Sequence, residues 1–225
     1  MSALHTRLAN SLESRKKRAI LRTLTPSLPA GPLVDFSSND YLSLGTSPLL
    51  RKKLLASLAL LLSPYGPPSS RLLDGNSPHH LALESQLATF FRADAALLFN
   101  SGFDANVGLW TCLPAPRDFV VYDALIHAST HDGMRASRVP ATNRRSFKHN
   151  DVADLARVLA GIKREEGVAT GVRSVWVAVE TLYSMDGDLS PLKEIVQTVE
   201  RVLERGNGHM VVDEVRCLRG RDERS

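Results

Sequence analysis

The sequence predicts an α/β protein with a mainly parallel sheet and flanking helices. From Ala95 onward, short apolar runs alternate with helical segments, which is the pattern of β-α-β units. Each predicted strand ends in small or polar residues, and parallel sheets bind ligands beyond the carboxyl ends of their strands. The composition fits a globular chain that can bury a core, since 43% of 225 residues are hydrophobic and 23% are charged.

The first segment, Met1–Leu24, is predicted to form an amphipathic helix because its leucines recur at near-helical spacing. Its basic run, Arg15–Arg18, is also compatible with a mitochondrial transit peptide, although a solvated helix face is the favoured interpretation. Prolines and a glycine over residues 26–32 then mark a linker, and the apolar run Leu33–Phe36 is a strand candidate.

The next helix begins with a clear start signal. Ser47 suits the N-cap and Pro48 the first helical position, and the helix is expected to run to about Leu62. A loop rich in proline follows.

Beyond residue 77 the chain is predicted to alternate between helices and strands. The predicted helices are Pro78–Phe91, a segment from about Ala105, His127–Ala136, Val152–Glu166 and Pro191–Arg205. The predicted strands are Ala95–Phe99, Phe119–Tyr122, Val175–Val179 and His209–Val212. The residues that end these strands are Asn100-Ser101-Gly102, Asp123, Glu180 and Asp213.

Composition and missing motifs argue against several classes of protein. The net charge of +4 is mild and spread out, which gives little support to a nucleic-acid partner. The longest apolar run, Leu54–Ser63, is too short to cross a bilayer. Two cysteines form no disulfide framework, which favours a reducing, cytoplasmic compartment. The absence of G-x-G-x-x-G, P-loop and G-x-S-x-G motifs argues against a Rossmann dehydrogenase, an NTPase and an ordinary α/β-hydrolase.

Three groups of residues at the predicted strand ends are candidates for chemistry. Gly102, at a strand–helix turn, can expose backbone N–H groups to an anion, or it can be a structural device. His127 can stack on a flat ring or move a proton, and with His131 at i+4 it can bind a metal; a capping or core histidine is the more common case. Asp213 can hold a protonated ring nitrogen, as sites for pyridoxal phosphate (PLP) require, or it can cap a helix.

Taken together, the motifs resemble the α-oxoamine synthases, a branch of the fold-type-I PLP enzymes. The similar stretches are Ser38–Leu44, Ser70–Asn76, His80–Glu84, Asn100–Gly108, Asp123–Gly133, Glu180–Leu192 and Val211–Glu214. They occur in the order of the family and with similar gaps, so the set is far more specific than any one motif.

The resemblance implies PLP as cofactor and a role for each matching residue. Gly102 and Phe103 would supply backbone contacts around the PLP phosphate. His127 would stack on the pyridine ring, and Asp213 would keep the ring nitrogen protonated so that the ring accepts electrons. Ser184 would lie near the ring hydroxyl.

The implied reaction joins an amino acid to an acyl-CoA and releases CO2 and CoA, with Asn39 facing the amino acid. The family pattern implies a homodimer. Related members of the branch use glycine or serine and other acyl-CoAs.

The resemblance also implies an organisation into domains. Residues 1–47 would be an N-terminal helix and linker belonging to a small domain, and 48–225 a PLP-binding large domain that is incomplete. The tail from about residue 215 departs from the family, which reads D-E-A-H where this chain has Asp213-Glu214-Val215-Arg216. No lysine follows Lys193, so no Schiff-base lysine is assigned, and a catalytically inactive, truncated fragment is the alternative to an active acyltransferase.

Overall fold

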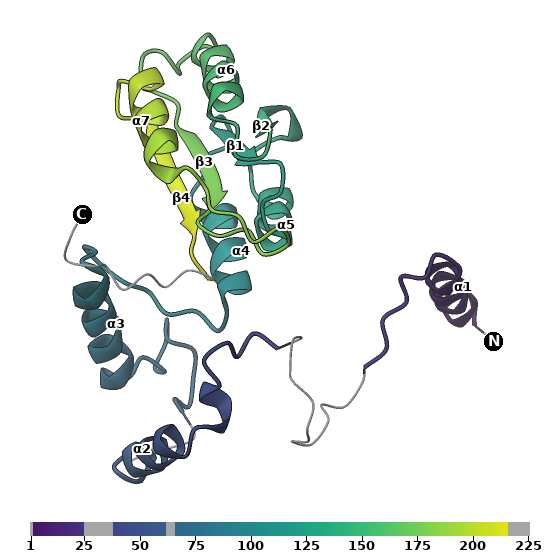
Figure 1. Cartoon of the computed structure of the whole chain (residues 1–225), viewed down its shortest axis with the longest axis vertical. Coiled ribbons are helices and arrows are strands. Elements are labelled where there is room, and N and C mark those ends of the chain that lie inside the picture. The colour runs from purple at the N-terminus through teal and green to yellow at the C-terminus, as the bar shows by residue number, and fades with distance from the viewer. Residues whose placement is uncertain (1, 25–37, 62–65, 216–225) are drawn as a thin grey trace. The chain divides into compact units, whose positions relative to one another are not determined.

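The computed structural model describes residues 2–24, 38–61 and 66–215, and its contacts divide the chain into two units, Met1–Gly75 and Asn76–Ser225 (Figure 1). The strand candidate Leu33–Phe36 and the residue Arg216 lie outside the described residues. Each unit is described by itself.

The first unit contains helices α1 (Ala3–Lys17) and α2 (Pro48–Ala59), with a short 3-10 helix, η1 (Leu44–Thr46), before α2. The start signal of α2 is confirmed, because the Ser47 hydroxyl accepts a hydrogen bond from the Leu50 N–H. None of the helical residues in this unit is buried.

The first helix ends earlier than its leucine spacing predicts. Ala19 adopts a left-handed backbone conformation, with φ of 54°, and the Ile20 N–H donates to the carbonyl of Arg15. This hydrogen bond, which spans five residues, is typical of a Schellman-like helix end. The predicted continuation to Leu24 is therefore wrong, since a left-handed residue stops the helical hydrogen-bond ladder.

The second unit contains the α/β part of the chain. Its helices are α3 (Pro78–Phe91), α4 (Gly102–Cys112), α5 (Ala128–Ala136), α6 (Val152–Lys163) and α7 (Leu192–Val202), with a 3-10 turn η2 (Ala141–Asn143). Its strands are β1 (Phe119–Asp123), β2 (Arg144–Phe147), β3 (Val175–Glu180) and β4 (Gly208–Asp213).

The four strands form one parallel sheet in the order β2-β1-β3-β4, which confirms the predicted sheet type. Strand β2 is an element that the sequence pattern does not predict. Only Phe147 of its four residues is buried, so this edge strand has no apolar run for a sequence pattern to reveal.

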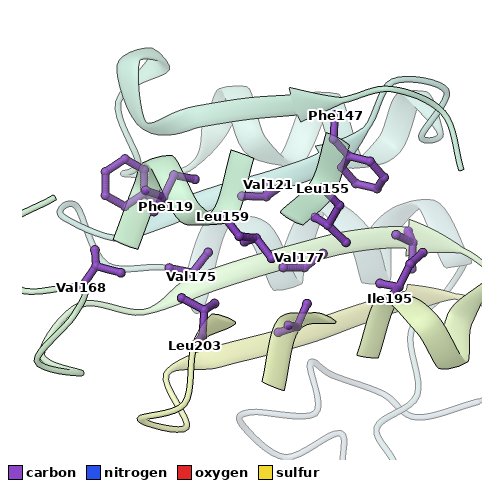
Figure 2. Close-up of a cluster of buried hydrophobic side chains, with 13 residues drawn as sticks. Phe119, Val121, Phe147, Leu155, Leu159, Val168, Val175, Val177, Ile195 and Leu203 are labelled. Carbon is purple, nitrogen blue, oxygen red and sulfur yellow. The ribbon is translucent and has the colours of Figure 1, made fainter. Parts of the chain in front are cut away.

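The sheet is covered by helices on both faces, and the alternation of side chains along the strands separates two cores (Figure 1). Val121 and Val177 point toward α6 and α7, where Leu159 is fully buried (Figure 2). Val120 packs on the opposite face, in the cluster that contains Trp110 of α4.

The segment Ala95–Phe99 does not form the strand that its apolar run predicts, so this prediction is wrong. No strand pairs with it among the described residues of the chain, and Leu97 and Phe99 are 67% and 47% exposed. The Leu98 N–H donates instead to the Glu84 carboxylate at 2.8 Å. An apolar run becomes a strand only where a neighbouring strand accepts its ladder hydrogen bonds.

Helices α4 and α5 approach each other closely at Gly133. A Cβ atom at this position would lie 2.9 Å from Trp110 Cβ and 3.1 Å from the Asn106 carbonyl oxygen. Both neighbours belong to or adjoin the α4 backbone, so they cannot rotate away. Glycine at 133 therefore sets the distance between the two helices.

We expect Gly133→Ala to destabilise the protein by about 1–3 kcal/mol, because it overpacks a rigid contact. Gly161→Ala is the matched control: Gly161 is exposed in α6 and a Cβ there meets nothing within 4 Å. That change should stabilise by about 0.5–1 kcal/mol through helix propensity. Denaturant unfolding of both variants measures the two changes in the free energy of unfolding. If Gly133→Ala also stabilised the protein, the close approach of α4 and α5 would be contradicted.

Candidate functional site

The candidate site lies at the carboxyl edge of the sheet, where Asp213 ends β4. The register of β3 and β4 places Asp213 directly opposite Glu180. The Asp213 carboxylate accepts a hydrogen bond from Asn106 Nδ2 at 2.8 Å through Oδ2, and from the Val215 N–H at 3.1 Å through Oδ1. One donor on each oxygen fixes the orientation of this carboxylate.

His127 lies at the N-cap of α5, one position before the first helical residue. Its Nδ1 lies 2.7 Å from Ser129 Oγ and accepts from the Ser129 N–H at 3.2 Å. A capping role, which the sequence left open, is thus part of what this histidine does. Among the described residues, only Nδ1 of this ring has a hydrogen-bond partner.

Asn106 connects the two predicted residues. Its Nδ2 donates to Ser129 Oγ at 2.9 Å as well as to Asp213. Ser129 is fully buried. Because His127 Nδ1 accepts from the Ser129 N–H, that nitrogen carries no hydrogen, so the Ser129 hydroxyl donates to it. We call the four residues His127, Ser129, Asn106 and Asp213 the Asn106 network.

The N-terminus of α4 lies beside this network. Ser101 is the N-cap and accepts from the Asp104 N–H at 3.0 Å, so the helix begins at Gly102 rather than near Ala105 as predicted. The Phe103 ring stands edge-on to the His127 ring, with centroids 6.5 Å apart. A Cβ on Gly102 would lie 2.8 Å from the Val215 side chain, so Gly102 adjoins the segment that follows Asp213.

The structure thus brings together four of the six predicted site residues: Gly102, Phe103, His127 and Asp213. Ser184 lies exposed in the loop after β3, and no contact joins it to the Asn106 network among the described residues. Asn39 belongs to the other unit, where its Oδ1 accepts from the Tyr41 hydroxyl at 3.3 Å.

His131 has a packing role in the structure. Its ring stands edge-on to Tyr122 with centroids 5.2 Å apart, and burial lowers its pKa below the usual value. Within the described part of the chain, no group of three or more His, Cys, Asp or Glu residues is arranged to hold a metal ion.

Asn106 and Ser129 are site residues that the sequence prediction missed. Both lie inside stretches that resemble the family, but neither follows a strand directly, so the strand-end pattern does not point to them. Asn106 lies one helical turn after Gly102, on the same face of α4, and this spacing is the signal that would have found it.

Comparison with known proteins places the chain in a family. The sequence profile described as aminotransferase class I and II matches residues 31–215. The 8-amino-7-oxononanoate synthase of Emericella nidulans is 47% identical over 94% of this chain and 51% of its own length. The aminoacyl transferase sphA of Aspergillus fumigatus is 38% identical over 92% of this chain and 44% of its own.

Solved structures of the same branch share the fold. Serine palmitoyltransferase of Sphingomonas wittichii superimposes with a TM-score of 0.63 at 30% identity, covering 75% of this chain and 38% of its own. The 8-amino-7-oxononanoate synthase of Francisella tularensis gives a TM-score of 0.61 at 23% identity, covering 81% and 45%.

The chain belongs to the class I and II aminotransferase family, and its fold is that of the fold-type-I PLP transferases. Within that family it is a member of the α-oxoamine synthase branch, whose members use pyridoxal phosphate. It spans about half the length of the curated relatives it matches. In the described residues, every helix is too short or too polar to cross a membrane.

The residues present fit part of a PLP site. A carboxylate with a fixed orientation faces the carboxyl edge of the sheet, a histidine ring lies on the same network, and a helix N-terminus adjoins both. These are the groups that a pyridinium nitrogen, a pyridine face and a phosphate require. Neither the Asn106 network nor the first turn of α4 contains a lysine that could anchor PLP covalently.

We expect the Asn106 side chain to be coupled energetically to its hydrogen-bond partners Ser129 and Asp213. Asn106→Leu leaves two acceptors without their donor, one of them fully buried, and should cost about 1–3 kcal/mol. A double-mutant cycle with Ser129→Ala should give a coupling energy of about 0.5–3 kcal/mol in the free energy of unfolding. Effects that simply add would show that the two side chains do not share a hydrogen bond in solution.

Proposed function

We propose that this sequence encodes the cofactor-facing part of a PLP-dependent, decarboxylating C-acyltransferase that joins an amino acid to an acyl-CoA. The observation that carries the proposal is the Asn106 network, in which His127 and Asp213, far apart in sequence, are joined at the carboxyl edge of the sheet. When bound, PLP supplies an electron-accepting ring that stabilises a carbanion next to the amino group of the substrate.

Asp213 is proposed to hold the proton on the pyridine nitrogen through a charge-assisted hydrogen bond. The Asn106 amide and the Val215 N–H keep its carboxylate aimed at that position. Both neighbours of the Asp213 carboxylate are N–H donors, and each of its oxygens keeps a further lone pair that can accept from a ring N–H.

His127 is proposed to cover one face of the ring. Its Nδ1 is engaged by Ser129, so the imidazole is held in one orientation by the same network that holds Asp213. The backbone N–H groups of Gly102 and Phe103 lie in the first turn of α4, where a helix has no internal acceptors for them, and they are proposed to bind the phosphate.

Ser184 is proposed to approach the ring hydroxyl and Asn39 the amino-acid substrate, as in the family pattern. The 47% sequence identity to an 8-amino-7-oxononanoate synthase, over 94% of this chain, favours oxononanoate synthase activity and with it a role in biotin biosynthesis. The likeness to serine palmitoyltransferase favours the runner-up, another α-oxoamine synthase with a different acyl donor or amino acid. The proposed assembly is the homodimer of the family, in the cytoplasm.

We expect Asp213→Asn to weaken PLP binding by about tenfold to a hundredfold, because the change replaces a charge-assisted hydrogen bond by a neutral one. Fluorescence titration of the chain with PLP measures the dissociation constant. Asp132→Asn is the matched control, since Asp132 forms an exposed ion pair with Arg135 on α5. Equal affinities of wild type and Asp213→Asn would overturn the proposed site.

The 225-residue chain is expected to bind PLP reversibly, without a covalent link at the site, and to release no CoA from an acyl-CoA and an amino acid. Treatment with PLP and borohydride, followed by peptide mapping, tests this. Reduced adducts should be scattered over exposed lysines and unaffected by Asp213→Asn. One stoichiometric adduct at Lys148 or Lys193 that Asp213→Asn abolishes would contradict the inactive alternative and identify the anchoring lysine.

A further inference from the structure

A second polar cluster lies at the carboxyl edge of the sheet, outside the Asn106 network. It is centred on His149, which follows β2, and it includes Asp123 from the end of β1 and Asp188 from the loop after β3. His149 Nδ1 lies 2.8 Å from Asp123 Oδ1, and His149 Nε2 lies 2.8 Å from Asp188 Oδ2. We call Asp123, His149, Asn150 and Asp188 the His149 cluster.

The two ring-nitrogen contacts of His149 depend on its protonation. Ionised carboxylates only accept hydrogen bonds, and a neutral imidazole has only one N–H to donate. Both ring nitrogens of His149 contact carboxylate oxygens, and only the protonated ring can donate to both. Asp123 is fully buried and also accepts from the N–H groups of Leu125 at 2.8 Å and Asn150 at 2.9 Å.

Asn150 reinforces the same arrangement. It adopts a left-handed backbone conformation, with φ of 53°, which is uncommon for residues other than glycine and is tolerated best by asparagine. In that conformation its N–H reaches Asp123 and its Nδ2 reaches Asp188 Oδ2 at 2.7 Å. The backbone at residue 150 is thus bent so that one residue contacts both carboxylates.

The loop held by Asp188 is the segment Thr181–Ser190, which carries Ser184. It is a short hairpin, because Leu182 pairs with Leu189 and the Tyr183 N–H donates to the Asp188 carbonyl at 3.0 Å. At its start, the Thr181 N–H donates to the carbonyl of Asp213 at 3.0 Å. The hairpin is therefore tied to β4 at one end and to the His149 cluster at the other.

The pKa shifts of His149 and Asp188 agree with these contacts. Burial alone lowers the pKa of His149, but the hydrogen bonds and charges of Asp123 and Asp188 outweigh it and raise the pKa above its ordinary value of 6.5. The hydrogen bond and charge of His149 lower the pKa of Asp188. The Tyr183 ring stands edge-on to the imidazole at 4.5 Å, and burial raises the pKa of its phenol, so Tyr183 stays neutral near pH 7.

We propose that His149 is a positioning residue: as an imidazolium between Asp123 and Asp188, it holds the hairpin Thr181–Ser190, and with it Ser184, against the carboxyl end of β1. The role given to Ser184 rests on the proposed function, whereas the holding of the hairpin does not. Among the described residues, the titratable groups that face His149 are Asp123 from β1 and Asp188 and Tyr183 from the hairpin.

The proposal gives a pH dependence with a defined sign. The folded state raises the pKa of His149, so its contribution is complete below the ordinary value of about 6.5 and is lost as the pH rises through the raised pKa. The pKa of Asp188 is lowered, so its contribution is complete above its ordinary value and is lost as the pH falls through the lowered pKa. The hairpin is therefore held most firmly in mildly acidic solution and loosens toward alkaline pH.

Hydrogen exchange of the hairpin amides in the full chain, without PLP, tests this directly. Protection factors of the Tyr183, Gly187 and Ser190 N–H groups, corrected for intrinsic exchange, should fall about tenfold or more between about pH 5.5 and about pH 8.5. In His149→Gln, which carries no charge and does not titrate, protection should be low at both values. Protection that is independent of pH in the wild type would overturn the proposal.

One control variant and one alternative measurement separate a positioning role of His149 from an effect on general stability. His209→Gln is matched, because His209 is also half-buried but contacts Trp176 and Ser174 rather than carboxylates. This variant should keep the wild-type pH dependence of the hairpin; its loss there would contradict the role of His149. If His149→Gln fails to fold, NMR titration of the wild type decides, since a His149 pKa at or below about 6.5 overturns the proposal and a higher one supports it.

The exchange experiment also separates this inference from the proposed function. Suppose that the wild-type hairpin shows the expected pH dependence while Asp213→Asn leaves the affinity for PLP unchanged. This result would refute the PLP site and leave the role of His149 intact. A chain that binds PLP through Asp213 but shows no pH dependence in its hairpin would refute only the role of His149.

Discussion

The parallel register of β1, β3 and β4 is the constraint on which the rest of the structure depends. It aligns the carboxyl ends of the strands, so that Asp123, Glu180 and Asp213 reach one edge of the sheet together. Apolar side chains on both faces fix this register, because a slip by one residue would turn each buried valine toward the wrong layer. The strand register that packs the core therefore also places these polar side chains at one edge of the sheet.

Two polar networks use that edge in different ways. The Asn106 network joins a helix, a helix cap and a strand end, and it holds a carboxylate and an imidazole that retain capacity for a ligand. The His149 cluster joins two strand ends and a hairpin, and its imidazole bridges two carboxylates. One network thus has groups left to offer a ligand, while the groups of the other are engaged in holding the loop beside it. The hydrogen bond from the Thr181 N–H to the Asp213 carbonyl ties the hairpin that carries Asp188 to the strand that ends in Asp213.

Close packing supports the first network. Because Gly133 has no side chain, α5 can lie against α4, and this brings the Asn106 amide within reach of Ser129. A polar contact between two helices therefore depends on a glycine that carries no chemistry itself. At Gly102 the contact is softer, because a Cβ there would meet only the exposed side chain of Val215.

Local patterns in the sequence were enough to predict the α/β class, the parallel sheet and most helices, because periodicity is a local signal. The four predicted residues that meet at the site were singled out by the resemblance of ordered motifs to a family rather than by spacing alone. The remaining features came from tertiary structure. Within the described part of the chain it gave Ala95–Phe99 no strand partner, and it added the polar edge strand β2 and recruited Asn106 to join Asp213 to Ser129. Strand pairing and contacts between distant side chains depend on which surfaces meet after folding, and no local pattern contains that information.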